Sequence, residues 1–85
     1  MYQIHNKEYA IREIQRFLVT ISQVEDSLPH VTVDGFYSDE TRLTVTEFQK
    51  ISGIEPTGMV DYETFNAIYT RHAEILKGRE NKNNV

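Results

Sequence analysis

Hydrophobic residues recur at helical spacing in three segments of this chain, and two polar connections separate the segments. In the first segment apolar side chains follow one another at intervals of three or four residues from Ile11 to Ile21, which predicts a helix near residues 7–24. The same spacing predicts helices near residues 39–52 and 62–77. No stretch alternates strictly between apolar and polar residues, so we expect an all-α fold, a three-helix bundle with structured loops.

Polar residues that suit helix starts precede each segment. Asn6, Ser38 and Asp61 stand where a side-chain oxygen can accept from the free backbone N–H groups of a helix start. Asp39 and Glu40 follow Ser38, in the first turn, where the helix dipole favours negative charge. These positions predict the starts of all three helices.

Glycines mark the expected helix ends. Gly53 follows the second segment and is predicted to end the second helix. Gly78 is predicted to end the third helix. Residues 79–85 are polar and rich in asparagine, so we expect a flexible tail there. The expected domain therefore spans residues 1–78.

The apolar stripes of the three segments predict the core. A helix in a small domain buries one face against its neighbours. We expect one side chain of the first helix and two from each of the others to meet in one cluster. These residues are Leu18, Val45, Phe48, Phe65 and Ile68.

A short pattern occurs twice, once before each of the last two helices. The copies are Gly35-Phe36-Tyr37-Ser38-Asp39-Glu40-Thr41 and Gly58-Met59-Val60-Asp61-Tyr62-Glu63-Thr64. Each has a glycine that permits a tight turn, then a bulky residue, a helix cap and Glu-Thr. We interpret the pattern as mainly architectural. The amides of Gln15 and Gln49 can tie the long loops to the helices.

Composition narrows the possible partners. The 85 residues carry a formal net charge of −4, and phosphate binding needs a basic face, so we expect no nucleic-acid partner. The same charge disfavours an anionic membrane surface, and no apolar run approaches the length needed to span a bilayer. The first seven residues show no signal peptide. We therefore expect either a fragment of a longer exported protein or a protein that reaches its site by another route.

No arrangement of residues indicates catalysis or a bound cofactor. His5, His30 and His72 lie in different elements, and the chain has no cysteine. Glu40 and Glu63 occupy first-turn positions, where the helix dipole already favours an acid. We expect a non-catalytic protein with no metal and no cofactor, and a half-buried side chain at His72.

An ordered series of motifs runs through most of the chain, over about residues 11–69. It includes Ile14-Gln15-Arg16-Phe17-Leu18, Val33-Asp34-Gly35-Phe36-Tyr37, Thr41, Val45, Phe48-Gln49, Gly53-Ile54, Thr57-Gly58-Met59-Val60-Asp61 and Thr64. This series resembles the peptidoglycan-binding domain family, the three-helix module of bacterial and phage cell-wall hydrolases. The chain departs from the family at Tyr37-Ser38, Thr44-Val45 and Phe65, with changes that preserve the turn, cap and core chemistry. The resemblance implies a three-helix fold and implies that peptidoglycan is the binding partner.

Residues outside the expected core stripes form a candidate ligand surface beside the starts of the second and third helices. Tyrosine combines a flat apolar ring with a hydroxyl, which suits sugars or peptide stems. An arginine can pair with a carboxylate of a stem peptide. The candidate residues are Tyr37, Asp39, Arg42, Leu43, Tyr62 and Asn66.

Two functions remain open from the sequence. The first is a non-catalytic, extracytoplasmic module that binds peptidoglycan and targets an enzyme or particle to the bacterial wall. The alternative is a protein–protein assembly module on the same fold, such as a component of a phage tail or contractile injection particle. In either case the expected partners include a linked hydrolase or another particle protein.

Overall fold

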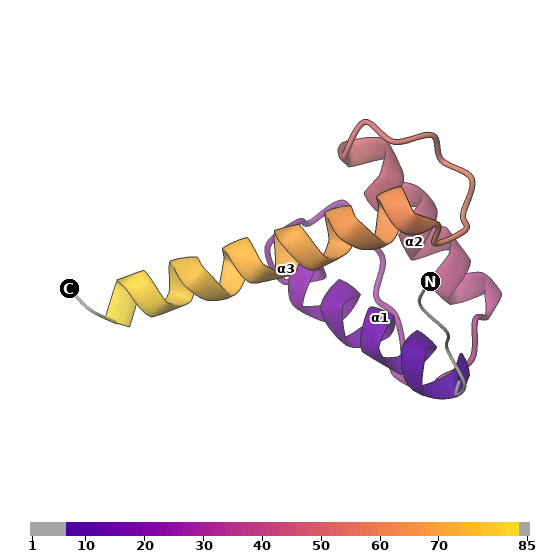
Figure 1. Cartoon of the computed structure of the whole chain (residues 1–85), viewed down its shortest axis with the longest axis horizontal. Coiled ribbons are helices and arrows are strands. Elements are labelled where there is room, and N and C mark those ends of the chain that lie inside the picture. Colours follow the sequence, from indigo (N-terminus) through magenta and orange to yellow (C-terminus); the bar gives the residue numbers. More distant parts are fainter. Residues whose placement is uncertain (1–6, 84–85) are drawn as a thin grey trace.

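The computed structural model describes residues 7–83 and shows three helices. They are α1 (Lys7–Ser22), α2 (Asp39–Ile51) and α3 (Tyr62–Asn83). Helices α1 and α3 pack against each other, α2 lies at one end of the pair, and the C-terminal half of α3 projects beyond both (Figure 1). No strand occurs in residues 7–83. The predicted all-α, three-helix architecture is confirmed.

The predicted caps of α2 and α3 are present. The Ser38 hydroxyl accepts from the backbone N–H of Thr41 at 3.5 Å. The Asp61 carboxylate accepts from the backbone N–H of Thr64 at 2.9 Å. Each cap therefore accepts a hydrogen bond from a backbone N–H in the first turn, which has no carbonyl partner within the helix. The predicted cap at Asn6 lies outside the described residues.

The predicted end of α2 is confirmed, whereas the predicted end of α3 is wrong. Gly53 has φ 73°, and the N–H of Ile54 donates to the carbonyl of Gln49 at 2.9 Å, as after a helix that ends in a left-handed residue. Helix α3 instead continues through Gly78 to Asn83. The backbone of Gly78 does not adopt the positive φ of a helix stop, and glycine alone only weakens a helix.

Substitution by alanine is expected to change the free energy of unfolding in opposite directions at Gly78 and Gly58. We expect Gly78→Ala to raise the free energy of unfolding by about 0.5–1 kcal/mol, because its φ is helical and no atom lies within 4 Å of an added Cβ. We expect Gly58→Ala to lower it by about 1–2 kcal/mol or more, because φ is +79° and the Cβ would lie 2.8 Å from Cγ of Arg42. Urea denaturation checks both. A destabilised Gly78→Ala variant would contradict a continuous α3.

One hydrophobic cluster joins the three helices and the first loop. Four of the five predicted core residues, Leu18, Val45, Phe48 and Ile68, lie in it. The other members are Ile21, Leu28, Val31 and Ile75. Leu28 and Val31 come from the connection between α1 and α2, so the loop closes the core as well as joining the helices.

The prediction that Phe65 belongs to this cluster is wrong. Its side chain is 41% exposed, whereas the neighbouring Thr64 is completely buried. The completely buried residues in this part of α3 are Thr64, which bonds to Gln49 of α2, and Ile68, four positions further on the same face of the helix. Phe65 lies one position further round the helix, on the side toward α1.

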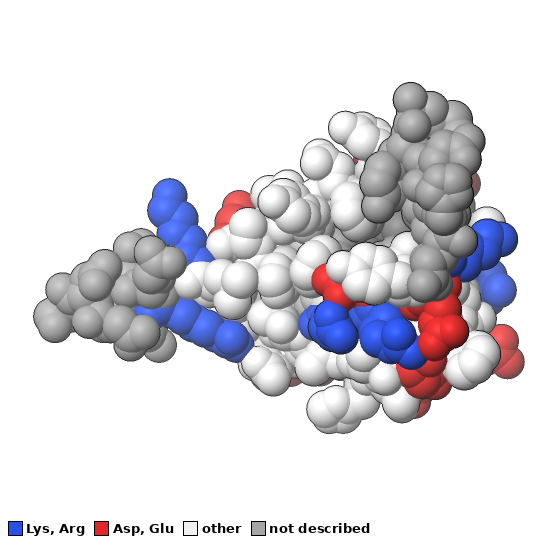
Figure 2. Space-filling model, turned by 60° about the horizontal axis from the view of Figure 1, so that its bottom comes forward, with Lys and Arg blue, Asp and Glu red and all other residues white. Residues whose placement is uncertain are grey.

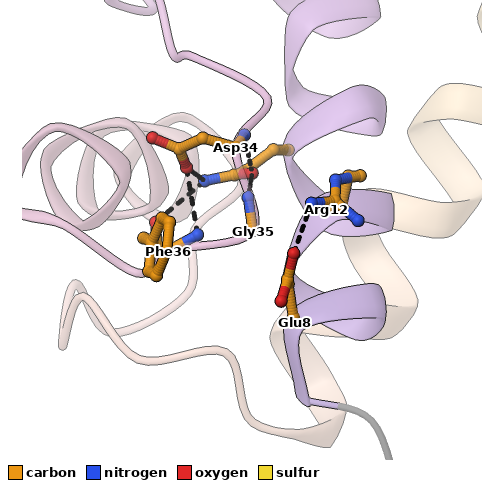
Figure 3. Close-up of polar contacts among 6 residues, drawn as sticks. Glu8, Arg12, Asp34, Gly35 and Phe36 are labelled. Atoms are coloured by element: carbon orange, nitrogen blue, oxygen red, sulfur yellow. Dashed lines mark hydrogen bonds and ion pairs between the residues drawn. The ribbon is translucent and has the colours of Figure 1, made fainter.

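A buried glutamine fastens the first loop to α1. The Oε1 of Gln15 accepts from the backbone N–H groups of Asp34 and Gly35, both at 2.9 Å. Its Nε2 donates to the carbonyl of Phe36 and the hydroxyl of Thr41, both at 3.0 Å, and to the carboxylate of Asp34 at 3.1 Å. Figure 3 shows Asp34, Gly35 and Phe36 of the loop beside α1, the helix that carries Glu8 and Arg12. This network holds the turn against the first helix.

Gln49 makes an equivalent network at the second turn. Its Oε1 accepts from the N–H of Gly58 at 2.8 Å. Its Nε2 donates to the hydroxyl of Thr64 at 2.9 Å, the carbonyl of Met59 at 3.0 Å and the hydroxyl of Thr57 at 3.3 Å. The prediction that the two glutamine amides tie loops to helices is confirmed. The repeated pattern is therefore a repeated hydrogen-bond unit.

Candidate functional site

An open groove of about 400 Å³ lies between α1 and the start of α3. Five aromatic side chains line it. They are Tyr9 and Phe17 of α1 and Tyr62, Phe65 and Tyr69 of α3. Pockets that bind small ligands are commonly concave and mainly apolar with a few polar groups, so this groove is the candidate binding site.

The period of α3 places its three aromatic residues along one side of the helix. Tyr62, Phe65 and Tyr69 are separated by three and four positions, which brings their side chains to one face. The rings of Phe65 and Tyr69 lie 6.4 Å apart between centroids with an interplanar angle of 23°. Phe17 meets Tyr69 edge-on, with centroids 6.3 Å apart. The aromatic wall is thus supported from both helices.

His72 lies beside this wall and is half-buried, as predicted. Its ring centroid is 4.4 Å from that of Phe17. No group of three His, Cys, Asp or Glu side chains within the described part of the chain is placed to hold a metal ion. The position of His72 is explained by its packing against Phe17.

The charged residues that line the groove are acidic. They are Glu13, which pairs with Arg16, and Asp61. The hydrogen bonds from Thr64 hold the pKa of the Asp61 carboxyl below its ordinary value, so this group is ionised at neutral pH. No lysine or arginine is among the described lining residues. The groove therefore presents aromatic rings and negative charge.

Figure 2 shows basic and acidic side chains close together on one face, beside a broad uncharged area. On α1 this intermixing reflects ion pairs within the helix, such as Arg12 with Glu8 at 2.6 Å. Charges paired in this way do not form the single-sign surface that phosphate binding requires. None of the described helices combines the length and the apolarity needed to cross a bilayer.

Of the six ligand-binding candidates predicted from the sequence, Tyr62 lies in the groove. Its side chain is 84% exposed and stands at the rim. Asp39 and Leu43 on α2 and Asn66 on α3 are exposed and do not line the groove. Hydrophobic spacing did not indicate this site, because it placed Phe65 in the core. The sequence feature that could have indicated the groove is the apolar stripe of α3, which is wider than the other helices of a small bundle can cover.

Tyr37 and Arg42 lie together. The Arg42 guanidinium is 5.7 Å from the ring centroid of Tyr37, within reach of a cation–π interaction. The Tyr37 hydroxyl donates to the carbonyl of Gly58 at 2.6 Å. Tyr37 is half-buried against the core, and burial raises the pKa of its hydroxyl. The expectation that Tyr37 lies off the packed face is therefore wrong, because its side chain joins the first repeat to the second.

Glu40 and Glu63 lie in the first turns of α2 and α3, as predicted. Oε1 of Glu40 accepts from the backbone N–H of Thr32 at 2.8 Å, which ties it to the first loop. Glu63 is exposed in the first turn of α3. Neither glutamate lines the groove. The arrangement of the groove suits binding of a ligand with flat apolar faces and hydroxyl groups.

Residues 7–68 match the model of a family described as "Putative peptidoglycan binding domain". The chain belongs to the peptidoglycan-binding domain family. The match includes α1, α2, both glutamine-centred networks and the first part of α3, and it confirms the resemblance seen in the sequence. Of the aromatic residues in the groove, Tyr69 lies just beyond the matched span. Searches of curated proteins and of solved structures found no match.

Proposed function

We propose that this peptidoglycan-binding domain holds an enzyme or a particle against the bacterial cell wall and does not itself cleave the wall polymer. The family match over residues 7–68 is the observation that carries the proposal. The aromatic groove supports it, because an exposed concave apolar surface on a small domain indicates a binding site. This function places the domain outside the cytoplasm, in contact with the wall.

A shallow site on a domain of this size gives weak binding to a single ligand. Peptidoglycan, however, presents the same chemical units many times along a polymer. Several domains carried on one enzyme or particle can then bind at once, and the overall affinity rises without any new contact. Weak individual binding is therefore consistent with a targeting role.

Sedimentation with purified sacculi tests the proposal. We expect the folded domain to sediment with the sacculi, and Tyr62→Ala to weaken the binding about fivefold or more, because the exposed ring is lost. Phe36→Ala is the matched control, since it removes another exposed aromatic ring, one that does not line the groove. Circular dichroism confirms that both variants remain folded.

Three outcomes would count against parts of this proposal. A folded domain that stays in the supernatant with walls of several bacterial types would favour the protein–protein assembly module. A fall in the turbidity of sacculi that tracks the purified domain would show catalysis. Equal binding by Tyr62→Ala and wild type, with loss in Arg42→Ala, would move the site to the surface formed by Tyr37 and Arg42.

A further inference from the structure

We propose that the groove between α1 and α3 binds the glycan strand of the wall through the faces of its sugar rings, and does not bind the peptide stems. The proposal rests on the function proposed above and names the part of the polymer that occupies the site. Two features of the groove carry it. These are the arrangement of the aromatic rings and the sign of the charges beside them.

The aromatic rings are arranged to meet a ligand with repeated flat faces. Tyr62, Phe65 and Tyr69 follow one another along α3, and the planes of Phe65 and Tyr69 differ by 23°. A β-linked sugar strand presents a row of C–H groups on the face of each ring, and these pack against aromatic faces. The tyrosine hydroxyls add polar groups at the ring edges. A row of rings along one helix therefore matches a polymer of sugars.

The charges in the groove oppose the carboxylates of a peptide stem. Peptide stems of peptidoglycan carry carboxylates, whereas N-acetylated sugars within the strand are neutral. Glu13 is paired with Arg16, so Asp61 supplies the unpaired negative charge, and no basic residue is among the described lining residues. A carboxylate held beside Asp61 would therefore be repelled. Sugar hydroxyls are donors, and a carboxylate is an acceptor only. Asp61 and Glu13 can thus accept hydrogen bonds from a neutral glycan.

The cation suited to a stem carboxylate lies elsewhere. Arg42 is placed over Tyr37, at the contact between the first repeat and the carbonyl of Gly58, and neither Arg42 nor Tyr37 lines the groove. The structure thus separates the cation from the aromatic wall. A stem carboxylate held by Arg42 would not need Tyr69 or Phe65.

Titration with two soluble probes tests the assignment. The first probe is the tetramer of N-acetylglucosamine, and the second is a free stem pentapeptide that ends in D-Ala-D-Ala. Both titrations are followed by NMR. We expect the sugar to shift the amide resonances of residues near Tyr62, Phe65 and Tyr69, and the peptide to leave these resonances unchanged. Tyr62→Ala should weaken sugar binding about fivefold or more, whereas Tyr62→Phe and Phe36→Ala should stay within about twofold of wild type.

A change of charge separates the two occupants further. Asp61→Asn keeps a cap of similar strength, because asparagine caps helices about as well as aspartate. Glu13→Gln keeps the length of its side chain. If the groove binds neutral sugars, we expect both variants to bind the tetramer the same or more weakly. If it binds a stem peptide, both should bind the pentapeptide more tightly, which would overturn the proposal.

The failure of this inference is distinguishable from failure of the proposed function. If the domain sediments with sacculi, but the sugar tetramer causes no shifts and Tyr62→Ala binds sacculi as wild type does, the wall function stands and the glycan assignment is wrong. If wild type dimerises in sedimentation equilibrium and Tyr62→Ala does not, a second copy of the chain is the occupant. That result would also overturn the proposal.

Discussion

Phe48→Ala is expected to lower the free energy of unfolding by about 3–5 kcal/mol, as for other buried aromatic side chains cut back to alanine. Phe48 is 2% exposed and lies in the cluster that joins all three helices. A domain of this size has a thin core, and the side chains around a truncated ring close only part of the space that it leaves. The change is large enough to unfold a marginally stable domain at 37 °C.

Urea denaturation followed by circular dichroism measures the effect. Phe36→Ala is the matched control, because it removes the same side chain at a position that is 67% exposed. We expect the control to change the free energy of unfolding by about 0.5 kcal/mol or less. A loss below about 1 kcal/mol in Phe48→Ala would show that the ring does not support the core.

Replacing either buried glutamine with methionine is expected to cost about 2–4 kcal/mol. Methionine has nearly the same length, so the main loss is hydrogen bonding. In Gln49→Met the N–H of Gly58 loses its partner. In Gln15→Met the N–H groups of Asp34 and Gly35 lose theirs. Buried polar groups without a partner retain the full cost of leaving water.

Hydrogen exchange distinguishes the two networks. Exchange at the Gly58 amide should accelerate in Gln49→Met more than in Gln15→Met, and exchange at the Gly35 amide should show the reverse order. Gln23→Met is the control, because Gln23 is exposed just after α1 and the hydrogen bond that it accepts from Arg79 is also exposed. A variant at Gln15 or Gln49 as stable as this control would show that the turns are held by other contacts.

Most of the fold was predictable because its signals are local. Ser38 and Asp61 cap helices that begin at the next residue, and Gly53 ends α2 through its own backbone conformation. Gly78 shows where local reasoning was insufficient. A glycine after an apolar stripe fits both a helix stop and a helix interior, and its φ decides between them. The helix continues because the backbone stays helical there.

The candidate site was less predictable than the fold. Tyr37 was expected on an open surface, but its hydroxyl reaches the carbonyl of Gly58, 21 positions further along the chain. Phe65 was expected in the core, but Thr64 occupies the interior position through its bond to Gln49. In both cases a polar contact between distant residues determined the direction of a side chain. Hydrophobic spacing carries no information about such contacts.

The sequence by itself determined the number of helices, the starts of α2 and α3, the end of α2, most of the core and the glutamine ties. These follow from caps, turns and periodicity within short segments. It also determined the family, through a series of residues that spans most of the chain. Only the tertiary structure decided that the aromatic residues of α3 form a groove with α1. A helix has one apolar stripe in sequence, but the neighbouring helix decides which part of it is covered. In this chain the uncovered part is the candidate binding site.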